Sequence, residues 1–141
     1  MMKKLFVQAM TLATLCCTLF ATTAQAGKAT LGPSTVKSGY SNYYFPSSNS
    51  DGFRITAGTS VKVHFALKTS ETNVKYGLCI SSIKNTKKSD TFKNKAQKAN
   101  RDSVSSVTST WTIKDTDRYK AFITNNTVGS ISVKNDSYIS Y

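Results

Sequence analysis

The single histidine, His64, is the side chain best suited to act as a general base near neutral pH. A hydrolase built on it would need a serine or cysteine nucleophile close by, and serines are abundant in the chain. However, no nucleophile motif of the G-x-S-x-G type occurs. His64 also falls on the polar side of the alternating segment Val61–Leu67, which is typical of a surface histidine on a strand. We therefore predict no catalytic role for His64.

Acidic residues could support glycoside cleavage by a carboxylate pair, or the binding of a hard cation. All but one of the seven fall in expected turns or in a lysine-rich segment, where short acidic side chains ordinarily serve turn geometry. Asp115 and Asp117 could share a calcium ion with Asn125, although a D-x-D pair in a turn is more often structural. One histidine and one cysteine in the expected mature chain cannot form a zinc site, and no glycine-rich phosphate loop occurs. The sequence thus predicts no catalytic residue, no metal site and no cofactor.

Cys79 is the only cysteine outside the first 26 residues, so an intramolecular disulfide cannot form in the rest of the chain. Alternation places Cys79 on the more polar face of the segment Val74–Ile80, where an exposed thiol could pair with a second molecule. A lone cysteine more often behaves as a small buried hydrophobe. We expect inert packing and a monomer rather than a disulfide dimer.

Two groups of residues are candidates for binding. The first is the tyrosine cluster Tyr40, Tyr43 and Tyr44, in which adjacent Tyr43 and Tyr44 must point to opposite faces of an extended chain. Exposed tyrosines can stack on sugar rings, or they can simply cover a sheet edge. Trp111, in contrast, is expected in the core.

The second candidate is the segment Lys84–Arg101, which we expect to form a long basic loop or short helix at about residues 84–103. Its single acidic residue is Asp90, and its formal charge is +6. The basic residues are Lys84, Lys87, Lys88, Lys93, Lys95, Lys98 and Arg101. Phe92, Ala96 and Ala99 have helical spacing, which favours a partial helix. Such a run is often only a solvated loop, but its length exceeds what a strand connection needs.

The first 26 residues have the three parts of a secretory signal peptide. Lys3 and Lys4 provide the positive region, an apolar stretch follows to about Ala21, and Ala24-Gln25-Ala26 suits a signal peptidase. A transmembrane anchor or a lipoprotein signal are the alternatives, but the apolar run fades into the cleavage motif, and no small residue precedes Cys16 as a lipobox requires. We expect cleavage after Ala26 and one domain at 27–141.

Removal of Lys3 and Lys4 with the signal peptide leaves a formal charge of +10. A strongly basic domain favours anionic partners, such as envelope polymers or lipid headgroups, although the charge could serve solubility alone. No feature indicates a specific nucleic acid or a membrane span in the mature chain. An exported domain without disulfides is more typical of bacteria than of animal secreted proteins.

Apolar residues alternate with polar ones along most of the remaining chain, which predicts strands. The clearest segments are Val61–Leu67 and Val74–Ile80, which we expect to pair as an antiparallel hairpin, and Val107–Ile113. The stretch 27–50 is expected to add one or two short strands. Seven or eight short strands with frequent turns predict an all-β fold, a single two-sheet antiparallel β-sandwich or jelly roll.

The segment Thr110–Val133, TWTIKDTDRYKAFITNNTVGSISV, resembles the jelly-roll C-terminal domains of secreted bacterial peptidases. The shared features are a strand, an acidic turn, an aromatic residue near the start of the next strand, an Asn-rich turn and a last strand. Arg118 stands where those domains have a glycine before the aromatic residue. The resemblance implies a jelly-roll fold and an accessory role, and it transfers no site residue.

These observations favour an exported binding module that attaches to an anionic envelope component. Two other functions stay open, a membrane-active toxin resembling a bacteriocin and an accessory protein or inhibitor of another secreted protein. Salt-reversible adsorption to anionic liposomes without leakage would distinguish the binding module from the toxin.

Overall fold

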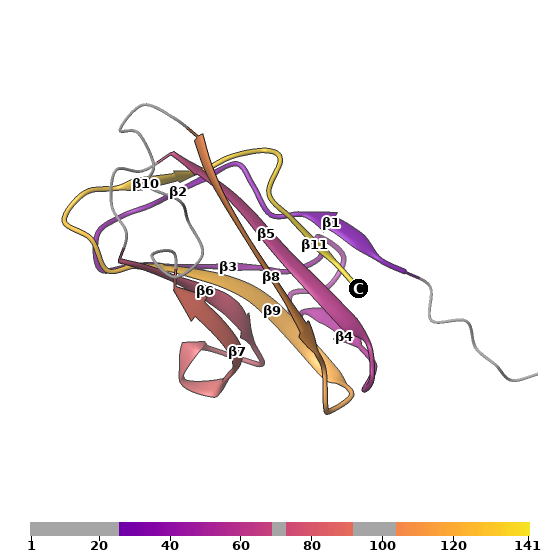
Figure 1. Cartoon of the computed structure of the whole chain (residues 1–141). Coiled ribbons are helices and arrows are strands. Elements are labelled where there is room, and N and C mark those ends of the chain that lie inside the picture. Colours follow the sequence, from indigo (N-terminus) through magenta and orange to yellow (C-terminus); the bar gives the residue numbers. More distant parts are fainter. Residues whose placement is uncertain (1–25, 69–72, 92–103) are drawn as a thin grey trace, which may run out of the picture.

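The computed structural model describes residues 26–68, 73–91 and 104–141. Two antiparallel sheets pack against each other, as the sequence predicted for a two-sheet β-sandwich (Figure 1). Residues 1–25, which make up all but the last residue of the expected signal peptide, and the segment 92–103, which holds the expected helix, lie outside the described residues.

Sheet A contains six strands with β5 at its centre. β8 pairs along one side of β5 over nine residue pairs, and β11 and β10 lie end to end along the other side. β1 and β2 pair with β11 and β10 in turn and form the outer edge. The strands are β1 (Lys28–Thr30), β2 (Ser34–Val36), β5 (Ser60–Lys68), β8 (Val104–Thr112), β10 (Ile131–Val133) and β11 (Tyr138–Ser140).

Sheet B contains five strands with β9 at its centre. β6 pairs along one side of β9, and β3 and β4 lie end to end along the other. β7 pairs with β6 and forms the second edge, and the short 3-10 helix η1 (Ile83–Asn85) precedes it. The strands are β3 (Ser41–Tyr44), β4 (Phe53–Ile55), β6 (Val74–Cys79), β7 (Thr86–Thr91) and β9 (Asp117–Asn125).

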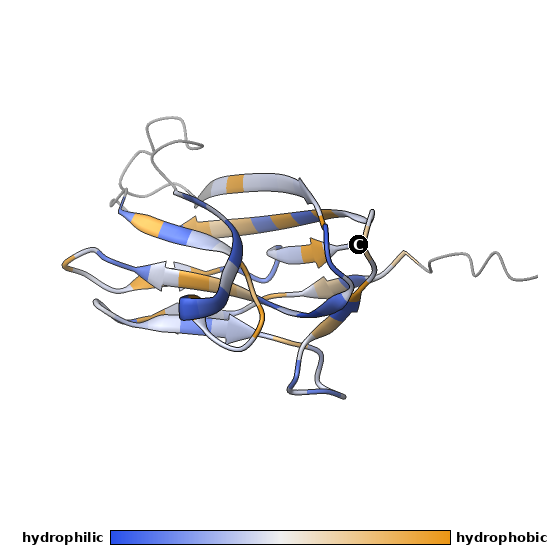
Figure 2. Ribbon diagram, turned by 90° about the horizontal axis from the view of Figure 1, so that it is seen from below, coloured by the Kyte–Doolittle hydropathy of each residue, from blue (hydrophilic) through white to orange (hydrophobic). Residues whose placement is uncertain are grey.

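The core lies between the sheets and is built from alternate residues of the longer strands, along which hydrophobic and hydrophilic residues alternate (Figure 2). On β5 the buried series is Val61, Val63, Phe65 and Leu67, and β9 provides Tyr119, Ala121 and Ile123 in the same way. Period-two alternation therefore predicted the buried faces correctly. Trp111 packs against this cluster as expected, with its ring centroid 6.4 Å from that of Tyr76.

The expected hairpin between Val61–Leu67 and Val74–Ile80 is wrong, because β5 belongs to sheet A and β6 to sheet B. The chain crosses from one sheet to the other between these strands, and residues 69–72 lie outside the described ranges. Alternation identifies the buried face of a strand but not its partner. Both faces of the core need strands with this pattern, so two consecutive strands can lie on opposite sides of it.

The expected loop or helix in the basic segment is also wrong where the structure describes it. Residues 86–91 form the edge strand β7. Its side chains alternate between exposed and half-buried positions, but every residue is polar, so no hydrophobic period marks the strand. Lysines on an edge strand oppose pairing with other chains.

A buried hydrogen-bond chain connects the two sheets next to β7. The Tyr76 and Ser109 hydroxyl oxygens are 2.7 Å apart, and the Ser109 hydroxyl donates to the Asp90 carboxylate at 3.1 Å. The proton of Ser109 is committed to Asp90, so Tyr76 is the donor to Ser109. Burial raises the pKa of Tyr76, and the nearby Asp90 adds to this, while the bond to Ser109 lowers it.

Replacing Ser109 with alanine should destabilise the fold by about 1–3 kcal/mol, because the buried Tyr76 hydroxyl would lose its acceptor. The matched control is Thr110→Ala on the next, exposed position of β8, which should change stability by less than about 0.5 kcal/mol. Urea unfolding of both variants measures the difference. Equal midpoints for the two variants would show that the hydrogen-bond chain contributes nothing.

Candidate functional site

The three candidate tyrosines lie in different surroundings. Tyr44 faces the core, with its ring centroid 5.7 Å from that of Phe65 and its hydroxyl 2.6 Å from the Ser34 hydroxyl. Burial raises the Tyr44 pKa. Tyr43 points to the outer face of sheet B, opposite Phe122 of β9. Tyr40 lies in the turn before β3 and is 65% exposed. Tyr43 and Tyr40 are therefore available to a ligand, whereas Tyr44 is a core residue.

The connection from β6 to β7 folds back over the outer face of sheet B. The Ile83 amide of η1 donates a hydrogen bond of 3.2 Å to the Tyr43 hydroxyl. Tyr43 lies on β3, two strands away from β6, so the connection passes over the intervening strand β9. This bond brings the two candidate groups together, since Lys84 follows directly in η1 and is exposed.

Gly77 of β6 allows β7 to lie close to the sheet. A Cβ atom at residue 77 would lie 1.9 Å from the Lys88 carbonyl oxygen and 2.7 Å from the Ser89 Cα. No side chain fits in that space, so glycine is required by the approach of the β7 backbone. A register shift between Leu78 and Cys79 adds a local irregularity to the same pairing.

Of the seven basic candidates, three lie in the described structure: Lys84 in η1, and Lys87 and Lys88 in β7. Lys93, Lys95, Lys98 and Arg101 lie outside the described residues. We use the term aromatic–basic face for the outer surface of sheet B together with its β7 edge. The face comprises Tyr40, Tyr43, Phe45, Ile83, Lys84, Lys87, Lys88 and Lys120.

The sequence analysis missed three members of the aromatic–basic face, Phe45, Ile83 and Lys120. The Lys120 ammonium lies 5.4 Å from the centroid of the Phe45 ring, a cation–π arrangement, and Phe45 is 44% exposed. Phe45 is the first residue after β3, which ends at Tyr44. Lys120 occupies an outward position of β9. Alternation around Ala121 and Ile123 could have placed Lys120 outward, but no sequence signal pairs it with Phe45.

Beneath the β6–β7 connection, Cys79 and Phe122 are fully buried although they lie on the outer side of sheet B, outside the core cluster. The inert packing expected for Cys79 agrees with this position. Burial raises the pKa of the Cys79 thiol to about 11, while the nearby Lys120 lowers it. The thiol is therefore protonated at neutral pH and shielded from a second molecule.

His64 lies on the outer face of sheet A, as alternation predicted. Its ring stacks on Tyr138 with centroids 5.0 Å apart, and its Nδ1 lies 2.8 Å from the Thr108 hydroxyl. Burial lowers its pKa, Asp136 raises it and Lys62 lowers it further. An activated nucleophile would need a carboxylate hydrogen-bonded to the ring, and among the described residues no such bond to His64 occurs.

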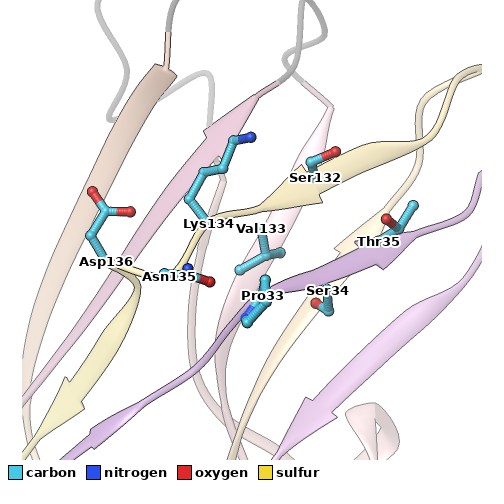
Figure 3. Close-up of a pocket in the computed structure, with 8 residues that line it drawn as sticks. All are labelled: Pro33, Ser34, Thr35, Ser132, Val133, Lys134, Asn135 and Asp136. Atoms are coloured by element: carbon cyan, nitrogen blue, oxygen red, sulfur yellow. The ribbon is translucent and has the colours of Figure 1, made fainter.

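A cleft of about 820 Å³ lies beside β2 and the start of the β10–β11 connection (Figure 3). Thr35 and Ser132, which are partners across the two strands, contribute hydroxyl groups, and Lys134 and Asp136 contribute one charge of each sign. The lining is Pro33, Ser34, Thr35, Ser132, Val133, Lys134, Asn135 and Asp136. This lining provides polar contacts but no nucleophile with an adjacent base. No sequence pattern indicates the cleft, because its two walls are about 100 residues apart along the chain.

Within residues 26–68, 73–91 and 104–141, no three side chains of the His, Cys, Asp and Glu types come together closely enough to hold a metal ion. The same part of the chain has no helix with the length and apolar character needed to span a bilayer.

Comparisons with known proteins do not identify a family. No protein-family model matches the sequence, and no curated protein matches it. Among solved structures, a chain described as "BiXyn10A CBM1 APO" is 12% identical with a TM-score of 0.43. The alignment covers 79% of this chain and 89% of that chain. We infer neither ligand nor function from this similarity, and the structure itself defines the class of protein, an all-β two-sheet sandwich.

Iodoacetamide should leave Cys79 unmodified in the native protein near neutral pH and should modify it after unfolding in urea, because native Cys79 is buried and protonated. The folded-state pKa of about 11 lies above the ordinary value of 9.0. The contribution of this thiol to stability is therefore complete below pH 9 and is lost as the pH rises through 11.

The matched variant is Cys79→Ala, which removes the titrating group while other alkaline titrations remain. Stability of the wild type relative to this variant should fall between pH 9 and 11. Rapid modification of the native protein, or a difference in unfolding free energy that does not vary with pH, would contradict the buried thiol.

Proposed function

We propose that this protein is an exported, non-catalytic binding module that attaches to an anionic component of a bacterial cell envelope, a wall polymer or lipid headgroups. The observation that carries the proposal is the hydrogen bond from the Ile83 amide to the Tyr43 hydroxyl. This bond brings Lys84 of η1 next to Tyr43, while Lys87 and Lys88 lie on β7 at the other edge of the same sheet. A lysine-rich stretch thereby becomes part of a defined face that also offers aromatic rings.

The charge of the aromatic–basic face supports an electrostatic attachment. Near an anionic surface each lysine contributes on the order of 1 kcal/mol, and the field fades over about 8 Å at physiological salt. Lys84, Lys87 and Lys88 lie on one connection and its edge strand, so their charges gather along one edge of sheet B. The side chains of the adjacent Lys87 and Lys88 point to opposite sides of β7. Attachment by these residues is reversible and sensitive to salt.

The exposed rings supply a second kind of contact. Tyr40 and Phe45 are exposed by 65% and 44%, and Ile83 by 39%. Tyrosine combines an apolar ring with a polar hydroxyl, which suits stacking on a sugar or insertion among lipid headgroups. The combination favours a polar, anionic surface with some apolar character over a simple counterion.

We also propose that the module is monomeric and non-catalytic. The module uses no cofactor and performs no catalysis, since His64 is engaged with Tyr138 and Thr108 on the opposite sheet. The buried position of Cys79 favours a monomer over a dimer linked by a disulfide. The module is released by a signal peptidase and is retained at the envelope by its charge rather than by a specific nucleic acid.

Replacing Lys84, Lys87 and Lys88 with glutamine should weaken adsorption to anionic envelopes about 100-fold, because three contributions of about 1 kcal/mol are lost. The matched control is Lys62, Lys68 and Lys134→Gln, which removes the same charge from the outer side of sheet A. Sedimentation with isolated envelopes at several salt concentrations measures both variants.

The control should lose much less adsorption than the Lys84, Lys87 and Lys88 variant, and both should keep the thermal midpoint of the wild type. Equal losses would show that only net charge matters and would overturn the assignment to the aromatic–basic face. Adsorption that is absent in the wild type, or unaffected by salt, would overturn the proposed function itself. Release of a dye from anionic liposomes would favour a membrane-active toxin instead.

The exported protein should begin at Gly27, because Ala24 and Ala26 satisfy the specificity of the peptidase. Intact-mass measurement of protein recovered from the culture medium and from envelopes measures this directly. An uncut chain, or one carrying lipid on Cys16 or Cys17, would contradict the proposed export route.

A further inference from the structure

A cavity of about 220 Å³ lies between β7 and the connection from β8 to β9. Its lining is Lys87, Lys88, Ile113, Lys114, Asp115 and Tyr119. Half of these residues are lysines, and they come from two segments that are far apart in the sequence. Lys87 and Lys88 also belong to the aromatic–basic face, whereas Lys114 was not singled out by the sequence.

Hydrogen bonds fix the wall of this cavity that carries Lys114. The buried Tyr119 donates its hydroxyl proton to the Asp115 carbonyl at 2.6 Å. One residue before Lys114, the Ile113 amide donates to the Thr59 carbonyl at 3.0 Å, and the Ile113 carbonyl accepts from the Gly58 amide at 2.8 Å. The backbone on both sides of Lys114 is therefore held in place.

The opposite wall is β7, which is equally constrained. β7 pairs with β6, its backbone approaches Gly77, and Asp90 accepts the buried hydrogen bond from Ser109. Lys87 and Lys88 therefore lie on a strand whose position is set from inside the sandwich. Both walls of the cavity are formed before any ligand arrives, which reduces the entropy lost on binding.

The charge of the cavity is unbalanced. Three lysines face one carboxylate, Asp115, so the formal charge of the lining is +2. In the part of the chain that the structure describes, none of the three lysines forms an ion pair. A recess lined by one sign of charge concentrates counterions of the other sign. An anion in this cavity would relieve the repulsion among the lysines.

The volume of the cavity and the type of its hydrogen-bond donors limit which anions it can hold. At about 30 Å³ per water molecule, the cavity holds about seven waters, enough for one compact anionic group and a few neighbouring atoms but not for a polymer segment. No arginine lines this cavity, so no planar fork is available for bidentate binding of either a carboxylate or a phosphate. Several lysine ammonium groups, each a point charge, suit the three or four oxygens of a phosphate.

We infer that the cavity formed by Lys87, Lys88 and Lys114 binds a phosphate group, a monoester or diester that belongs to the anionic target. This inference rests on the proposed function, because it names the chemical group by which the envelope component is recognised. The aromatic–basic face supplies attraction to any anionic surface, and the cavity adds selectivity for phosphate over carboxylate.

The test is a titration of the purified, isotope-labelled protein with inorganic phosphate at constant ionic strength, followed by the backbone amide signals. Saturable shifts are expected at Lys87, Lys88, Lys114 and Asp115, and acetate should produce none. Lys114→Gln should weaken phosphate binding about tenfold or more, because a charge-assisted contact is lost. The matched control, Lys68→Gln, removes one exposed charge from the end of β5 that pairs with the start of β8, away from the cavity, and should leave the phosphate affinity unchanged.

The variant Asp115→Asn should change the phosphate affinity in the opposite direction from Lys114→Gln. It removes the one carboxylate of the lining, so phosphate should bind more tightly, and it keeps the backbone carbonyl that accepts from Tyr119. Shifts that do not saturate, equal effects of Lys114→Gln and Lys68→Gln, or equal responses to acetate and phosphate would each overturn the inference.

Two probes distinguish the possible sources of the phosphate group, a lipid headgroup and a polymer. Perturbation of the cavity amides by phosphatidylcholine vesicles that contain phosphatidylglycerol supports a lipid headgroup, and perturbation by soluble poly(glycerol phosphate) supports a polymer. Saturable phosphate binding without envelope adsorption would support the cavity and overturn the proposed attachment. Adsorption that is unaffected by Lys114→Gln, in a protein without saturable phosphate binding, would support the attachment and overturn the cavity.

Discussion

The hydrogen bond between Tyr76 and Ser109 crosses the interface of the two sheets, and its continuation to Asp90 determines where the basic edge strand lies. Tyr76 is a fully buried aromatic residue, and its hydroxyl needs a partner that the apolar core cannot provide. Ser109, on sheet A, accepts the hydrogen bond from the Tyr76 hydroxyl and donates its own hydrogen bond to the Asp90 carboxylate on β7. A polar network in a low-dielectric interior holds its members in one arrangement. The interior of the sandwich thereby fixes a strand whose side chains face solvent.

Gly77 provides the complementary constraint from the other side of sheet B. With no Cβ atom at this position, the β7 backbone and the β6–β7 connection come close enough to cover the outer face of the sheet. This cover explains why Cys79 and Phe122 are buried on a face that alternation assigns to solvent. The same cover carries Ile83 to Tyr43 and so creates the aromatic–basic face. One missing side chain thus has consequences for packing, thiol chemistry and the candidate site.

Local pattern was enough to predict the fold class and the buried faces, but not the pairing of strands. Val61–Leu67 and Val74–Ile80 have the alternation of two half-buried strands, and this pattern is the same whether they pair in one sheet or face each other across the core. The sequence pattern could not predict β7, because the side chains of this strand are all polar. Its stability derives from backbone pairing and from the contact of Asp90 with the interior. The tyrosines and the basic segment were predicted as separate candidates. Only the folded connection between β6 and β7 joins them, and Lys114 and Lys120 required the tertiary structure altogether.

The order in β7 changes what its lysines can recognise. A flexible lysine-rich loop attracts any polyanion in proportion to its net charge, because its side chains adapt to each partner and lose conformational entropy on binding. On a strand held by Tyr76, Ser109 and Gly77, the backbone of the lysines keeps a fixed relation to the backbone of Lys114 across the cavity. Under the phosphate proposal, this arrangement favours an anion of one size over others of equal charge. Attraction over a distance needs only net charge, whereas selectivity needs fixed geometry. In the proposed attachment, the open face would supply the attraction and the cavity the selectivity, and both include the basic strand that is anchored from the core.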